Sequence, residues 1–403
     1  MGRWGLVCLV WVLATQAAKA DDALLKDLSA KLVAMRGTHP ATNEYGAGPE
    51  LIPIKHQIRL WIESELPKLG EHGDVDRLAK DLNQKLSSAG LMCGDPSAQK
   101  CTSGDNFEPR GFVDDVHLSY LNSRYLLVRT NVGVLCGYDE SAYVYAWREN
   151  RWALFFETEQ NDYRKGHYTP QNLFSVSISP GKANHLPLVL TLGYSPWCQS
   201  AWQKLFARLW RVSKVNSSLP PIFDLTDVVY LNDDGPQERL SDHDALFAFE
   251  SSSIDGDVFT RTHVWRLAAN DHSVRRLEPV ALSPRDFVDE WLTRPWNEGV
   301  GWIEPSQNGS QLRDWYVRYH RGVEIIFGEF DGPPLRCRSD KTLWQVGFTQ
   351  QGGPKNPDLS AYFLVRWLAP YRFTLVDIRT SKSRDCDVKD PMRDNVGTLL
   401  PLH

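Results

Sequence analysis

The 403-residue chain lacks the short motifs by which many enzymes are recognised. It has no His-Glu-x-x-His helix, no Gly-x-Ser-x-Gly elbow, no phosphate-binding P-loop and no dinucleotide fingerprint. The nearest sequence, GYSPW at 193–197, lacks the second glycine of the elbow. These absences weigh against catalysis, although they do not exclude a hydrolase whose active site leaves no motif in one sequence.

Patterns typical of metal sites are also missing. No cysteine pair has Cys-x-x-Cys spacing, and no two of the 11 histidines stand four residues apart. We therefore expect no cofactor and no transition metal. Calcium is excluded less firmly, because the acidic sequences NDDGP (232–236) and DGD (255–257) could hold it, although they also fit tight turns.

Basic tracts and long apolar runs are scarce as well. The formal net charge is −5, and no cluster of Lys and Arg is present, which disfavours nucleic acid as a partner. Beyond the first 20 residues no stretch is long and apolar enough to span a bilayer, so we expect no transmembrane segment in the mature chain.

The first 20 residues have the form of a secretory signal peptide. Arg3 supplies the positive start, residues 4–14 are apolar, and Ala18-Lys19-Ala20 fits the small-residue pattern before a cleavage site. We expect cleavage after Ala20 and a soluble mature chain that is secreted or periplasmic.

Six of the seven cysteines remain after this cleavage, and an even number in an exported chain indicates disulfides. Two cysteines are close in sequence and separated by turn residues, and two others precede a Trp by 11 and 12 residues in what look like adjacent repeats. The remaining two are then paired by elimination. The expected pairs are Cys93–Cys101, Cys136–Cys198 and Cys337–Cys386.

Residues 21–92 have the hydrophobic spacing of helices. Leucines and a methionine recur at helical intervals from Leu25 to Met35. A second helix is predicted from Pro53 to Leu66, and a third after Asp74, a suitable N-cap, up to Gly90. This N-terminal region carries no catalytic signature.

Residues 93–282 contain short runs rich in Val, Tyr, Phe, Trp and Leu, which are typical of strands. Segments 125–148, 187–211 and 246–266 share an order: a strand, a loop, and a second strand ending in Trp-Arg. A third strand then reaches an acidic residue. We interpret them as repeated three-strand antiparallel meanders.

Residues 283–403 are expected to form a helical insertion, a final β repeat at 343–378 and a polar tail. The helix would begin at Ser283-Pro284, which resembles a capping box with proline in the first turn. The predicted fold is therefore mainly antiparallel β with helical additions. A β-propeller, a sandwich and two α+β halves all fit this pattern.

Two functional hypotheses of different classes follow. The first is a non-catalytic binding or scaffolding protein of the cell envelope or extracellular space, with a glycan or an envelope protein as partner. The second is a carbohydrate-active hydrolase, which needs two carboxyl groups at a defined separation. Its candidate residues are Glu157 and Asp224, which follow the Trp of their segments.

Overall fold

A computed structural model describes most of the chain in two compact units, residues 1–226 and 227–403. The described residues are 23–36, 48–93, 102–103, 106–107, 110–134, 137–161, 170–181, 186–195, 200–212, 220–231, 235–256, 260–270, 273–277, 281–305, 309–321, 326–352, 357–369 and 372–389. Among these residues, no helix is long and apolar enough to cross a membrane. The predicted signal peptide lies outside the described residues.

The first unit begins with the expected helices. Residues 23–36 are helical and are followed by α2 (Leu51–Glu65), η1 (Leu66–Lys68) and α3 (Val75–Ser88). The side chain of Asp74 caps α3 by accepting a hydrogen bond from the Arg77 backbone N–H at 3.0 Å. Gly90 follows α3 with a φ of +69°, a conformation that glycine adopts without steric cost. The predicted N-cap and stop of this helix are confirmed.

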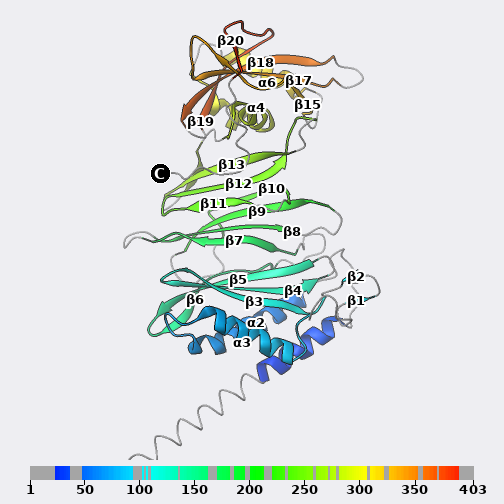
Figure 1. Ribbon diagram of the computed structural model, residues 1–403, viewed down its shortest axis with the longest axis vertical. Helices are drawn as coiled ribbons and strands as arrows, with labels where there is room; N and C mark the ends of the chain where they lie inside the picture. The colour runs from blue at the N-terminus through cyan, green and yellow to red at the C-terminus, as the bar shows by residue number, and fades with distance from the viewer. Residues whose placement is uncertain are drawn as a thin grey trace, which may run out of the picture. The chain divides into compact units, whose positions relative to one another are not determined.

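The first large sheet has the order β3-β4-β5-β6, and α2 and α3 cover one of its faces (Figure 1). Its strands are β3 (Val113–Asn122), β4 (Tyr125–Val134), β5 (Gly137–Arg148) and β6 (Arg151–Thr158). Tyr143 and Tyr145 of β5 join the helical core, whereas Ala142 and Val144 belong to a second core on the opposite face. Strand β5 is thus buried on both faces.

A second sheet supplies that opposite core. It has the order β10-β9-β8-β7, with β7 (Asn172–Ile178), β8 (Leu188–Ser195), β9 (Trp202–Arg211) and β10 (Phe223–Tyr230). Val176 and Val189 of this sheet belong to the same buried cluster as Val144. A bulge in β6 directs both Phe155 and Phe156 into the same core. Apart from these sheets, β1 (Thr102–Ser103) and β2 (Asn106–Phe107) form a small antiparallel pair.

The second unit contains two sheets and the inserted helices. The strands of its first sheet are β11 (Gln237–Leu240), β12 (Asp244–Ser252), β13 (Thr260–Ala269) and β14 (Val274–Arg276). The helices are α4 (Pro284–Thr293), α5 (Trp296–Gly299), η3 (Val300–Trp302) and α6 (Gly309–Tyr319). The last sheet contains β15 (Gly328–Phe330), β16 (Leu335–Cys337), β17 (Leu343–Gln350), β18 (Leu359–Ala369), β19 (Arg372–Arg379) and β20 (Cys386–Lys389).

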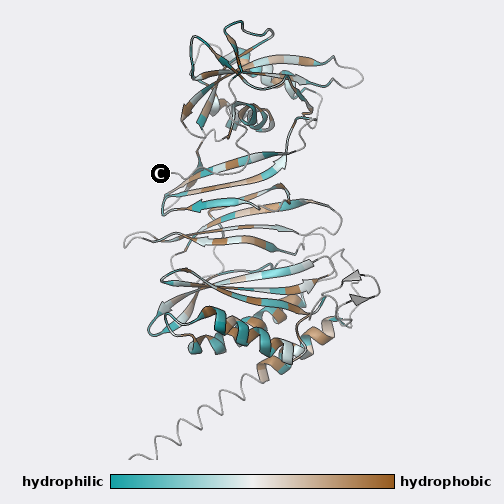
Figure 2. Cartoon of the chain, viewed as in Figure 1, coloured by the Kyte–Doolittle hydropathy of each residue, from teal (hydrophilic) through white to brown (hydrophobic). Residues whose placement is uncertain are grey.

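The helices and the last sheet of this unit share one core. Phe287 and Trp291 of α4 are fully buried there together with Phe363 of β18. As the sequence predicts, the side chain of Ser283 caps α4, accepting a hydrogen bond from the Asp286 backbone N–H at 3.1 Å. Figure 2 shows the resulting mixture of hydrophobic and hydrophilic residues along these strands and helices.

A disulfide between Cys337 and Cys386 joins β16 to β20. It is the pair that the sequence favours by elimination. The two residues are 49 positions apart, so on the loop-entropy model the bond stabilises the fold by about 4 kcal/mol. Cys93 is also disulfide-bonded. Its expected partner Cys101 lies outside the described residues.

The antiparallel β prediction with an N-terminal helical region is confirmed, but the predicted meander of three strands is too short. Each of the first three large sheets has four consecutive strands, and the last has six. Trp147, Trp210 and Trp265 each lie on the third strand of their four-stranded sheet. In each of these sheets the first strand was not predicted. These strands are β3, β7 and β11, and each precedes the Trp-Arg segment of its sheet. Repetition of one sequence unit and propeller closure remain predictions.

An ion pair buried in the first unit joins the helical region to the first sheet. The ammonium group of Lys55 in α2 lies 2.8 Å from a carboxylate oxygen of Asp139 in β5, and both side chains are fully buried. Lys55 also donates to the carbonyl of Gln160 at 2.8 Å, and Asp139 accepts a hydrogen bond from the Gln171 backbone N–H at 3.1 Å. Each charge therefore has hydrogen-bonding partners in place of water.

We predict that Lys55→Met destabilises the first unit by about 3–5 kcal/mol, because it leaves Asp139 buried without its cation. Urea unfolding of the mature chain measures this change. Lys80→Met, at an exposed position of α3, is the matched control and should change stability by less than about 0.5 kcal/mol. Equal unfolding midpoints for the two variants would contradict the prediction.

Candidate functional site

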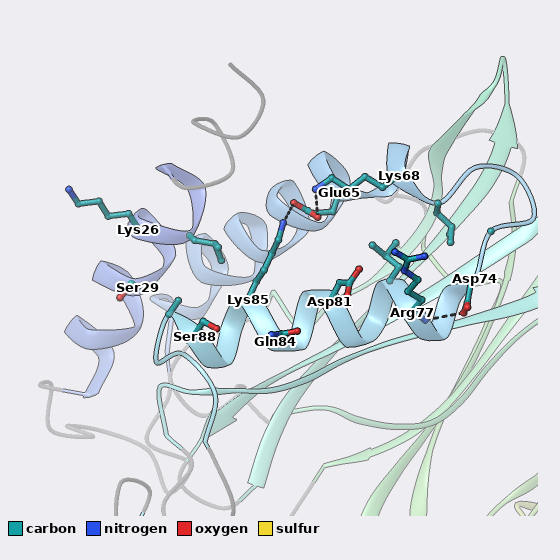
Figure 3. A pocket seen from close by; sticks show the side chains of 15 residues that line it. Lys26, Ser29, Glu65, Lys68, Asp74, Arg77, Asp81, Gln84, Lys85 and Ser88 are labelled. Atoms are coloured by element: carbon teal, nitrogen blue, oxygen red, sulfur yellow. Dashed lines mark hydrogen bonds and ion pairs between the residues drawn. The ribbon is translucent and has the colours of Figure 1, made fainter. Parts of the chain in front are cut away.

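The candidate functional site is a groove of about 1090 Å³ among the N-terminal helices (Figure 3). Helix 23–36 contributes Leu25, Lys26 and Ser29, and the end of α2 with η1 contributes Glu65 and Lys68. The remaining lining residues come from the segment before and along α3. They are Leu69, Gly73, Asp74, Arg77, Leu78, Asp81, Gln84, Lys85, Ser88 and Ala89.

One face of α3 forms a long side of this groove. Arg77, Asp81, Lys85 and Ser88 recur at intervals of three or four residues, so they lie on one stripe of the helix. On another face, leucines of α3 are buried in the core. The amphipathic sequence of α3 thus anchors the helix on the sheet and leaves a polar stripe of about 16 Å along the open groove.

A buried carboxylate fixes two lysines at the groove. Glu65 has a side chain only 2% exposed, and its two oxygens contact different ammonium groups. Lys68 approaches one oxygen at 2.7 Å, and Lys85 approaches the other at 2.5 Å. Figure 3 shows Glu65 between these two lysines. The lysine side chains themselves are 56% and 37% exposed, so one buried negative charge holds two positive groups close to solvent.

The groove was not foreseen from the sequence, although part of its pattern is visible there. The spacing of Glu65 and Lys68 favours an i, i+3 ion pair, and the polar stripe of α3 has helical spacing. Contact between Lys85 and Glu65 depends on how α2 and α3 pack, which neither helix specifies alone.

The structure places Glu157 on the helix-covered face of the first sheet. It lies opposite Tyr143 in β5 and forms an ion pair with Arg59 of α2. The neighbouring Glu159 accepts a hydrogen bond from the Tyr143 hydroxyl. Burial, and then the charge of Glu159, raise the pKa of Tyr143 well above its usual value, which keeps this phenol a hydrogen-bond donor.

Asp224 lies in the second sheet, where it faces Arg208 of the neighbouring strand at 3.3 Å. That sheet packs on the face of the first sheet opposite the one that carries Glu157. Packed sheets are about 10 Å apart, and the Glu157 side chain points away from the second sheet. The two carboxylates therefore do not converge as a catalytic pair, for which separations of about 5–9.5 Å are needed.

Two other carboxylates of the second unit do lie near each other. Glu304 and Asp340 both contact Arg366, and Glu304 does so at 3.0 Å. Hydrogen bonds from the Thr342 side chain and backbone, and then from Arg366, lower the pKa of Asp340 to about 2. A carboxyl group ionised to such low pH is a poor general acid near neutrality. Asp377, the acid after Trp367, is paired with Arg379 of its own strand at 2.8 Å.

The second unit also contains a buried charge cluster centred on Glu290 of α4. Arg261 contacts one carboxylate oxygen at 2.6 Å, while Arg276 and Arg294 both contact the other at 2.7 Å. The Nδ1 atom of His263 lies 3.5 Å from Glu290. Burial alone would raise the pKa of Glu290, but Arg261, Arg276, His263 and Arg294 together hold it well below its usual value.

This cluster fixes α4 on the sheet β11–β14. Asp289, the neighbour of Glu290, contacts Arg261 at 2.6 Å and accepts hydrogen bonds from the Ser253 hydroxyl at 2.7 Å and the Ile254 backbone N–H at 3.1 Å. The carboxylates are thus held by arginines and backbone groups that α4 and its neighbours supply. These contacts pair the charges with groups of the fold itself, so we assign the cluster a structural role.

Among the described residues, one group of side chains has the spacing of a metal site. It consists of Cys337, Asp385 and Cys386. Its two sulfur atoms are bonded to each other, so they are not free thiolates that could bind a metal. Cys136 and Cys198, the other expected disulfide pair, lie outside the described residues.

We predict that His263 makes the second unit less stable in mild acid. Burial, and then the charge of Arg261, lower the pKa of His263 well below 6.5. Below pH 6.5 the unfolded chain therefore binds a proton that the folded chain does not, and stability falls as the pH falls. Asp286 has the opposite effect, because burial raises its pKa to about 6. The contribution of His263 must therefore be isolated by substitution.

The test compares His263→Gln with the parent chain in urea unfolding from pH 7.5 to pH 5. Relative to this variant, the parent should lose up to about 1.4 kcal/mol per pH unit below pH 6.5. His243→Gln, at an exposed position of the same unit, is the control and should follow the parent profile. A constant difference between parent and His263→Gln across this range would disprove the effect.

Comparisons with known proteins assign no family. No family model and no curated protein matches this chain. A solved structure described as a glycoside hydrolase is similar over 73% of this chain and 80% of its own, with 7% sequence identity and a TM-score of 0.23. A similarity at that TM-score carries no argument about fold or function.

Proposed function

We propose that this protein is an exported, non-catalytic binding protein of the cell envelope or extracellular space, and that the groove of the N-terminal helices is its binding site. The observation that carries this proposal is the contrast between two kinds of polar group. The candidate catalytic carboxylates Glu157 and Asp224 are paired separately with Arg59 and Arg208. The groove instead presents exposed cationic and hydroxyl groups along an open surface.

Export is supported by the apolar segment 4–14, by the small residues before position 21, and by the Cys337–Cys386 disulfide, which is favoured in an oxidising compartment. The first residue of the mature chain is expected to be Asp21. N-terminal sequencing of the protein recovered outside the cytoplasm of its host checks this. Recovery of the exported protein with Met1 still present would contradict cleavage after Ala20.

A binding and hydrolysis panel tests the proposed function. Affinity electrophoresis measures retardation of the mature chain in gels that contain neutral or acidic polysaccharides, and a reducing-end assay follows cleavage of the same polymers. We expect retardation by at least one polymer without new reducing ends. Glu157→Gln and Asp224→Asn should leave retardation unchanged.

Release of reducing ends by the parent chain, with loss in either carboxylate variant, would instead establish a hydrolase. Retardation by no polymer would remove the support for glycan as the partner.

A further inference from the structure

The lining of the groove indicates which chemical class of ligand it fits. We propose that the groove binds a linear acidic polysaccharide, whose carboxylates contact the lysine pair at Glu65 and whose hydroxyl groups bond to the polar stripe of α3. This inference rests on the proposed binding function and adds to it the ligand class and the residues that recognise it.

The lysine pair is suited to an anion because it is already held in place. Lys68 comes from η1 and Lys85 from α3, yet both contact the one carboxylate of Glu65. A free lysine loses side-chain entropy when it binds a ligand, and here the ion pairs have already restricted both chains. The lining as a whole contains four cationic residues, Lys26, Lys68, Arg77 and Lys85, and three acidic ones, Glu65, Asp74 and Asp81.

Further along α3, positive and negative groups alternate. Arg77 and Asp81 are exposed and line the groove with Gln84 and Ser88. Arg77 adds a second cationic position two helical turns from Lys85. Asp81 and Gln84 are acceptors that hydroxyl groups can satisfy. A chain that carries both carboxylates and many hydroxyl groups matches this alternation.

Two other ligand classes fit the same surface less well. A neutral glycan would bring no charge to the cationic groups, and the lining contains no aromatic ring whose stacking could take the place of that contact. An acidic peptide would supply anions, but its side chains lack the hydroxyl groups that could donate to Asp81 and Gln84 along the stripe. The open course of the groove along α3 suits an extended polymer.

The test is isothermal titration of the mature chain with oligogalacturonate of defined length. The comparison ligands are its methyl ester, which lacks the charge, and poly-glutamate, which lacks the hydroxyl groups. We expect the oligogalacturonate to bind, the ester to bind at least about tenfold more weakly, and added salt to weaken binding.

Two substitutions locate the site. Arg77→Gln removes an exposed charge from the groove and should weaken oligogalacturonate binding about threefold to fivefold. Lys85→Gln should weaken it more, and circular dichroism verifies that this variant is folded. Lys80→Gln removes the same charge from α3 outside the groove lining and should bind like the parent.

The outcomes distinguish failure of the proposed ligand class from failure of the groove as a binding site. Tighter binding of poly-glutamate or of the ester, still weakened by Arg77→Gln, would overturn the polysaccharide and leave the groove as a binding site. Binding of oligogalacturonate that Arg77→Gln and Lys85→Gln leave unchanged would overturn the groove as the binding site. If none of the three ligands binds, the ligand class is overturned.

Discussion

The architecture of the first unit depends on a strand that buries side chains on both of its faces. Tyr143 and Tyr145 of β5 need an apolar cover on one face, and Ala142 and Val144 need one on the other. Helices α2 and α3 meet the first need, and the sheet β7–β10 meets the second. Three layers follow from this one constraint, because neither cover alone would remove the strand from water.

Arginine determines what the carboxylates of this protein can do. Glu157, Asp224 and Glu290 each lie against at least one guanidinium group. Each of these carboxylates has a partner that a substrate would have to displace. At Glu290 burial alone would raise the pKa, but the arginines hold it well below its usual value and so oppose its protonation. In the groove the cations are lysines instead, and the two that share Glu65 reach toward solvent.

Local features of the fold could be predicted where a local rule governs them. Asp74 and Ser283 cap their helices because a side-chain oxygen next to a helix start satisfies free N–H groups, wherever the rest of the chain lies. The sequence AYVYAW at 142–147 of β5 is apolar at every position, so burial on both faces has a signal in the sequence. The additional strands β3, β7 and β11 were missed, because the segments were compared through their Trp-Arg ends and these strands lie outside them.

Contacts between distant segments could not be predicted in the same way. Nothing near Glu290 in the sequence indicates that Arg261 and Arg276 approach it from two strands. The lysine pair of the groove could not be predicted for the same reason, because its lysines come together only when α2 packs beside α3. Glu157 and Asp224 occupy similar places in their segments, but similar sequence positions in two packed sheets do not bring side chains into one cleft.

The buried pair of Lys55 and Asp139 bears on the order in which the first unit can form during synthesis. The helices precede β5 in the chain and therefore leave the ribosome first. Until Asp139 has followed, Lys55 has no buried counter-ion, and packing its charge into an apolar core is unfavourable. The helices can therefore pack in their final place only after β5 has been made and supplies the opposite charge.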